Sequence, residues 1–224
     1  MSLIIRQPRP LKRDAGTFRD DRLFIVACDD TYAPKQYFNF FKISRVQVHV
    51  FPSEGGLSSI ADHVLDKLLS IEHEEFDELW LLLDTDHYIH GEHLKGFSNA
   101  LSRARQNHVN IALSRPCFEL WLLLHQVGKS DVADLDDAVS VTKKLREVLG
   151  EYNKTNLKKE HFTIDKVANA ILEAQALDSK TVGGIIPANT TTRIYLLWKS
   201  IISKAALSQL PQPLADIQKQ FLKS

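Results

Sequence analysis

The chain has 224 residues, and its 28 basic side chains balance its 28 acidic ones. With 44 % hydrophobic and 25 % charged residues, the composition is typical of a globular protein with a real core. No apolar run approaches the roughly 20 residues that span a bilayer, and two cysteines are too few for a disulfide framework or a zinc-ligand cluster. The sequence therefore predicts a cytoplasmic protein without a membrane segment.

The neutral total hides an uneven distribution of charge. Residues 1–22 hold 6 basic and 3 acidic side chains, residues 23–114 hold 7 and 13, and residues 115–224 hold 15 and 12. An acidic middle between basic flanks fits a metal site beside a phosphate-binding face. It also fits an ordinary patchy surface, and charge alone favours that second interpretation.

The first half of the chain alternates between two patterns. Residues 1–22 lack periodicity and are predicted to form a flexible basic arm. Short apolar runs then predict strands at 23–28, 46–50, 79–83 and 109–113. Helical patterns lie between them, beginning at Pro34, after Gly56 and at Leu94. Strands that alternate with helices predict a parallel α/β sheet.

The second half of the chain has helical patterns. Residues 118–124 are apolar almost all round, which indicates a buried helix. Amphipathic helices are predicted over 131–149 and 163–177, another from an N-cap at Asn189 or Thr190 to about Ala206, and a short one after Pro213. We therefore predict an α/β domain over 23–125 and a helical region over 126–224 that packs on the same structural unit.

Acidic residues follow two of the predicted strands. Asp29 and Asp30 end the first strand, and Asp84 and Asp86 end the third. Ligands of open α/β sheets bind outside the carboxyl ends of the strands, so these carboxylates converge if the two strands are neighbours. In extended chain Asp84 and Asp86 point to the same side. Clustered carboxylates resist ionising together, and Mg²⁺ relieves that repulsion. The alternative is that the aspartates form turns and caps.

Two further features of the sequence suggest ligands. Glu119 lies at the start of the buried helix, where an unpaired carboxylate is costly. We expect it to meet a cation, a metal-bound water or the backbone N–H groups of that helix, with simple helix capping as the alternative. His87, His90 and His93 follow at a spacing of three, which suits zinc, but their loop-like setting favours exposed histidines.

Five blocks of the chain form a pattern. They are the strand-end acid followed by Pro34 and Tyr37-Phe38, Asp-Thr-Asp at 84–86, Ser-Arg-Pro-Cys-Phe-Glu-Leu-Trp at 114–121, Tyr-Asn-Lys-Thr at 152–155, and Pro-Ala-Asn-Thr-Thr-Thr at 187–192. Together they resemble the RloB-like family, whose domain is a variant of the Toprim fold. The block that begins at Ser114 continues through Leu-Leu-Leu-His to residue 125 and is the most distinctive. The resemblance implies a Toprim-like α/β fold with a parallel sheet flanked by helices.

The resemblance also implies a function. In the Toprim scheme Asp84 and Asp86 bind Mg²⁺ or Mn²⁺, Asp29 acts as general acid/base or as a further metal ligand, and Glu119 is counted with them as a catalytic residue. RloB-like proteins are associated with phage defence and abortive infection, often near a partner ATPase. The expected protein is a metal-dependent nuclease that acts on DNA or RNA, tRNA included.

Two positions depart from the family pattern. Asp29-Asp30 stand where Toprim domains normally have Glu-Gly, and Arg115 stands where Asn is usual. The first departure favours an alternative function, a catalytically degenerate sensor or adaptor that keeps the fold and binds a partner ATPase. The second brings a positive charge beside the expected site.

Candidate phosphate contacts lie mainly in the helical region. Lys154 belongs to a run of lysines, and Thr191 and Arg193 are expected at a helix N-terminus, a natural anion site. With Arg115, these residues are the predicted substrate-binding set. A solvated lysine run and an ordinary helix cap are the alternatives.

Overall fold

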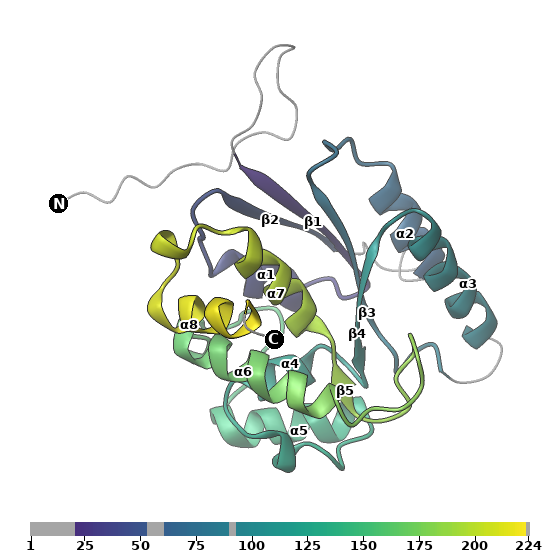
Figure 1. Cartoon of the computed structure of the whole chain (residues 1–224). Helices are drawn as coiled ribbons and strands as arrows, with labels where there is room; N and C mark the ends of the chain where they lie inside the picture. The colour runs from purple at the N-terminus through teal and green to yellow at the C-terminus, as the bar shows by residue number, and fades with distance from the viewer. Residues whose placement is uncertain (1–20, 53–60, 90–92, 223–224) are drawn as a thin grey trace.

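The computed structural model in Figure 1 describes residues 21–52, 61–89 and 93–222. A five-stranded sheet has the order β2-β1-β3-β4-β5. Its strands are β1 (Arg22–Cys28), β2 (Val46–Pro52), β3 (Glu78–Asp84), β4 (Asn110–Arg115) and β5 (Thr191–Thr192). The first four pair in parallel, and β5 pairs antiparallel with β4. The predicted Toprim-like α/β fold with a mainly parallel sheet is confirmed.

The sheet lies between two hydrophobic cores, and β1 contributes to both. The side chains of Phe24, Val26 and Cys28 face one core. Those of Leu23, Ile25 and Ala27 face the other. A central strand covered on both faces needs apolar side chains at every position. For this reason residues 23–28 and residues 79–83 form continuous apolar runs in the sequence.

Helices cover both faces of the sheet (Figure 1). One face packs against α2 (Ala61–Leu69) and α3 (His93–Gln106). The core on the other face takes side chains from α1 (Ala33–Asn39), α4 (Glu119–Leu123), α5 (Ala138–Leu149), α6 (Ile164–Asp178), α7 (Ile194–Lys204) and α8 (Gln212–Phe221). Every residue of α4 is buried, as its all-apolar sequence predicts apart from Glu119. Within the described ranges no helix is long and apolar enough to cross a bilayer.

Two predicted helix starts are wrong. α5 begins at Ala138 rather than at 131, because Asp137 caps it by accepting a hydrogen bond from the Ser140 N–H at 2.8 Å. α7 begins at Ile194 with Arg193 as N-cap, not at Asn189 or Thr190. The two residues before Arg193 instead extend the sheet as β5.

Some predictions fall on residues that the structure does not describe. Residues 1–20 of the predicted basic arm lie outside the described ranges, and Arg22 already opens β1. The same holds for residues 57–60 of the predicted second helix and for His90.

Candidate functional site

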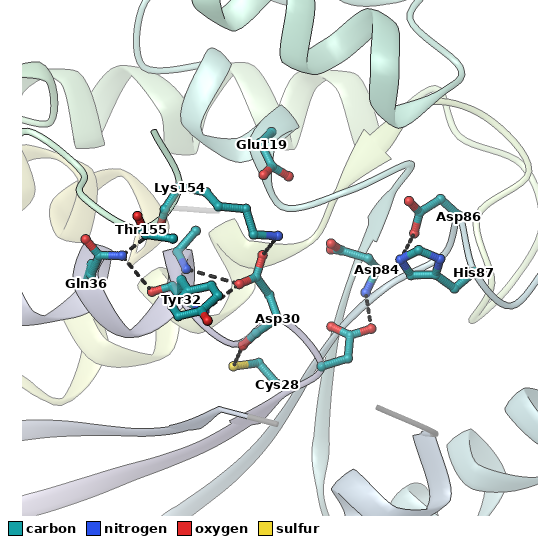
Figure 2. Close-up of polar contacts among 12 residues, drawn as sticks. Cys28, Asp30, Tyr32, Gln36, Asp84, Asp86, His87, Glu119, Lys154 and Thr155 are labelled. Atoms are coloured by element: carbon teal, nitrogen blue, oxygen red, sulfur yellow. Dashed lines mark hydrogen bonds and ion pairs between the residues drawn. The ribbon is translucent and has the colours of Figure 1, made fainter. Parts of the chain in front are cut away.

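The carboxyl ends of β1 and β3 lie side by side, because the two strands are paired with Cys28 opposite Leu82. Asp29 follows β1 and Asp84 is the last residue of β3. An Asp29 carboxylate oxygen, Oδ2, accepts a hydrogen bond from the Asp84 backbone N–H at 3.2 Å (Figure 2). The expectation that the two strands are neighbours is therefore confirmed, and it brings the two acids together.

The acids at this edge are electrostatically unsatisfied. Burial, together with the charges of Asp30 and Asp86, raises the pKa of Asp29 to about 7. Burial also raises the pKa of Asp84 well above its ordinary value, and the charges of Asp29, Glu119 and Asp86 add to that effect. Such shifts are expected where carboxylates face one another without enough positive charge. We refer to Asp29, Asp84, Asp86 and Glu119 as the carboxylate cluster.

Glu119 joins this cluster from helix α4 rather than from the end of a strand. As the first residue of α4 it is only 7 % exposed. Its Oε1 accepts a hydrogen bond from the Tyr152 hydroxyl at 2.8 Å. Burial and the charge of Glu119 raise the pKa of Tyr152, so the phenol keeps its proton and remains a donor. The partner of this buried acid is thus a neutral tyrosine.

Asp30 has a different task from Asp29. Its Oδ1 accepts hydrogen bonds from the backbone N–H groups of Tyr32 (2.6 Å) and Ala33 (3.1 Å) at the start of α1. Its Oδ2 lies 3.0 Å from the Lys154 ammonium. For Asp30 the capping alternative holds, and its second oxygen anchors a cation beside the cluster.

Asp86 follows Asp84 across a turn rather than in extended chain. β3 ends at Asp84, and the Thr85 and Asp86 N–H groups both donate to the Pro116 carbonyl, so the chain turns here. The alternation rule for extended chain therefore does not apply to this pair, although both side chains line the same hollow. Figure 2 shows the Asp86 carboxylate turned toward His87, with 3.6 Å between Asp86 Oδ1 and His87 Nε2. That Oδ1 is buried and accepts no hydrogen bond.

The donor set of the cluster suits a hard divalent cation. Among the residues with described positions, no three His, Cys, Asp or Glu side chains already surround a single metal position. Mg²⁺ does not need three, because it is held through one or two carboxylates together with waters and substrate phosphates. Asp84 and the Oδ1 of Asp86, which accepts no hydrogen bond, could provide such ligands. Of the histidines proposed for zinc, His87 has a side chain that is 78 % exposed.

Lys154 is the cation that the fold itself supplies. The Gln36 side chain holds the loop that carries it, by donating to the Lys154 carbonyl at 2.7 Å and accepting from the Leu157 N–H at 2.9 Å. Burial lowers the pKa of Lys154, but the charges of Asp30, Glu119 and Asp84 outweigh it and raise that pKa overall. The predicted substrate-binding residue Lys154 is thus placed beside the cluster.

Two hollows flank the cluster. One, of about 560 Å³, is lined by Asp29 and Asp84 together with Tyr32, Tyr88 and Phe97. The other, of about 590 Å³, is lined by acidic residues of the cluster and by residues of α5 and of the loop after it. Lys154 lines both. The acids are therefore accessible to a ligand from two sides.

The remaining predicted substrate-binding residues lie elsewhere. Arg193 donates through Nε to both carboxylate oxygens of Asp178, at 3.1 and 3.3 Å, and through Nη1 to the carbonyls of Gly184 and Ile185. The fully buried Thr191 has its hydroxyl 3.5 Å from Asp178 Oδ1.

Tyr195 completes this second group by donating its hydroxyl to Asp178 Oδ2 at 3.0 Å. We refer to Asp178, Thr191, Arg193 and Tyr195 as the Asp178 network. None of its members, nor Arg115, lines either hollow. Arg115 donates to the Pro187 carbonyl at 3.0 Å, so these cations are bound by the protein itself.

Tyr152, Thr142 and Arg146 line the second hollow and were not predicted as site residues. Tyr152 lies two residues before Lys154 in the Tyr-Asn-Lys-Thr block, so this motif is a sequence signal that could have identified it. Thr142 and Arg146 lie on α5. In the sequence they look like ordinary polar positions of an amphipathic helix, and only the packing of α5 beside α4 brings them to the cluster.

Comparison with known proteins identifies a family for the chain. The model of the RloB-like protein family matches residues 24–201, which include the strands, the carboxylate cluster and the Asp178 network. No curated protein and no solved structure matches the chain. Because the match covers most of its length, the chain belongs to the RloB-like family.

Proposed function

We propose that this protein is a metal-dependent nuclease that hydrolyses phosphodiester bonds of DNA or RNA, tRNA included, as a cytoplasmic effector of phage defence and abortive infection. One observation carries the proposal. Burial and neighbouring acids raise the pKa of both Asp29 and Asp84, at a sheet edge that is open to two hollows. Strongly perturbed acids in a hollow are typical of functional sites.

Each residue of the carboxylate cluster has a proposed role that follows from its position. Asp84 and Asp86 would hold Mg²⁺ or Mn²⁺, which supplies Lewis-acid stabilisation of the phosphate and a more acidic bound water. Asp29, with a pKa of about 7, exchanges a proton near neutral pH, as a general acid or base must. It is also near enough to Asp84 to serve as a further ligand. Glu119 keeps Tyr152 oriented through their hydrogen bond.

A second function is favoured by specific observations. Asp29-Asp30 replace the Glu-Gly of other Toprim domains, the Asp86 carboxylate is turned toward His87, and Lys154 already provides positive charge beside the acids. These features fit a sensor or adaptor that has lost catalysis and binds a partner ATPase.

Purified protein incubated with DNA, tRNA and total RNA tests the proposal, with Mg²⁺ and with Mn²⁺. We expect cleavage by the wild type and a loss of at least about a hundredfold in Asp84→Asn and Asp86→Asn, since each removes a charged ligand. Asp134→Asn is the matched control, because that acid is exposed and lines neither hollow. It should cleave like the wild type.

Two results would contradict the nuclease. One is equal cleavage by the wild type and by the Asp84→Asn, Asp86→Asn double variant. The other is a wild type that neither cleaves nor binds Mg²⁺ or Mn²⁺ in calorimetry while co-purifying with an ATPase, which is the behaviour of the adaptor.

A further inference from the structure

The hollow of about 590 Å³ has walls of opposite charge. Asp84, Asp86 and Glu119 line it from the strand ends and α4, whereas Arg146 and Lys154 line it from α5 and the following loop. Its volume lies in the range of small-ligand sites, roughly 300–1,000 Å³. The acidic side chains by themselves would repel an anion. Arg146 and Lys154 therefore determine whether the hollow can accept an anionic ligand.

One face of α5 forms the cationic wall. Ala138, Thr142 and Arg146 follow at intervals of four, so they lie on the same side of the helix, and all three line the hollow. The small side chain of Ala138 leaves room, Thr142 adds a hydroxyl, and Arg146 adds a planar cation. A ligand that enters the hollow meets both this face and the carboxylates.

Arg146 is available to bind such a ligand. Lys154 is paired with Asp30 at 3.0 Å and Arg193 is paired with Asp178. Within the described part of the chain, by contrast, exposed Arg146 makes no hydrogen bond or ion pair. An arginine presents five N–H donors in a fork that fits phosphate oxygens. In this hollow those donors have no protein acceptor.

We propose that this hollow binds the phosphodiester backbone of an unpaired nucleic-acid strand, with Arg146 as a phosphate-binding residue beside Lys154. The inference rests on the proposed function and adds a direction to it: phosphates lie toward α5, and the carboxylates face the reacting group from the sheet. A strand rather than a duplex is expected, because a hollow of about 590 Å³ accepts a flexible chain segment but not a rigid double helix.

Fluorescence anisotropy of a labelled twelve-nucleotide RNA tests this, with the full chain in Ca²⁺ and the RNA checked for integrity on a gel. We expect Arg146→Gln to weaken binding about tenfold, as for one lost charge-assisted contact. The slope of log K against log salt should fall by about 0.7, the value for one contact to a single strand. Lys143→Gln is the matched control, since it removes the same charge from exposed α5 surface outside the hollow.

The outcomes separate the two proposals. Equal effects of Arg146→Gln and Lys143→Gln, an unchanged salt slope in Arg146→Gln, absence of binding, or a duplex bound as tightly as the strand would each overturn the inference. A wild type that binds the strand with the expected Arg146 dependence but never cleaves it in Mg²⁺ supports the inference and contradicts only the nuclease. Circular dichroism confirms that both variants are folded.

Discussion

The carboxylate cluster and the Asp178 network both place acids in largely buried positions, yet they treat the charge in opposite ways. Asp178 receives donors from Arg193 and Tyr195. Asp29 and Asp84 face further acids instead, and their pKa values rise. Removing one partner of a buried, paired charge is strongly destabilising, whereas a buried acid left short of partners is suited to a ligand. The structure therefore separates a structural acid from functional ones by their partners.

The same contrast explains why similar sequence signals had different outcomes. Thr191 and Arg193 lie next to a helix start and look like an anion site, but the Asp178 carboxylate already satisfies them. Lys154 looks like one of several solvated lysines, and its ammonium lies 3.0 Å from Asp30 beside the cluster.

The largest expected effect is a pH dependence of stability that arises in the cluster. The pKa of Asp29 is raised in the folded state from 3.8 to about 7, so between these values the native protein binds a proton that the unfolded chain lacks. Without divalent ions, the free energy of unfolding should therefore fall as pH rises from about 4 to about 7, by up to about 4 kcal/mol.

Urea denaturation of the wild type and Asp29→Asn in EDTA at several pH values measures this term. The variant should lose most of the decrease, because its amide does not titrate. Parallel curves for the two proteins would show that Asp29 is not an unsatisfied acid, and the contrast with Asp178 would fail.

The next effect concerns removal of an acid from each group. Asp178→Ala leaves the Arg193 guanidinium without its carboxylate and should lower the free energy of unfolding by about 2–3 kcal/mol. Asp84→Asn removes a charge from among like charges and should leave stability unchanged or raise it in EDTA. Urea denaturation at pH 7 checks both. A cost for Asp84→Asn as large as that for Asp178→Ala would contradict the proposed difference.

The smallest effect comes from a matched pair of tyrosines. Tyr152 donates to Glu119 at 2.8 Å and Tyr195 donates to Asp178 at 3.0 Å. Each change to Phe removes one hydrogen bond to a carboxylate and should cost about 1 kcal/mol of stability. Only Tyr152→Phe should also lower the cleavage rate, because only Tyr152 lines a hollow beside the cluster. Equal activity of the two variants would contradict a role for Tyr152 in the site.

The fold was largely predictable because its signals are local. Continuous apolar runs identify β1 and β3 as central strands, and an all-apolar stretch identifies α4. β5 has no such signal, since Thr191 and Thr192 are only two polar residues and extend the sheet by pairing with the end of β4. The start of α5 was predicted too early, because the acidic segment that precedes the helix also fits an amphipathic pattern. Asp137 is the residue that caps the helix.

The site was predictable only in part, for a geometric reason. Asp29 and Asp84 lie at strand ends, so their meeting follows from strand order alone. The orientation of Asp86 depends on a turn that the Pro116 carbonyl stabilises from another strand end. Arg146 and Tyr152 reach the cluster through the docking of α5 and its loop, which depends on packing between distant segments and leaves no local trace in sequence.

The loop that carries Tyr152 and Lys154 also determines when the site is completed during synthesis. The four cluster acids all precede residue 120, and the groups that orient or balance them follow more than 20 residues later. A nascent chain therefore exposes the acids before Arg146, Tyr152 and Lys154 have left the ribosome, and it lacks the cationic wall until they do. Because a domain generally folds as a unit and one core joins β1 to α5, α6, α7 and α8, an unfinished copy of this protein lacks both the cationic residues and the packing that completes the proposed site.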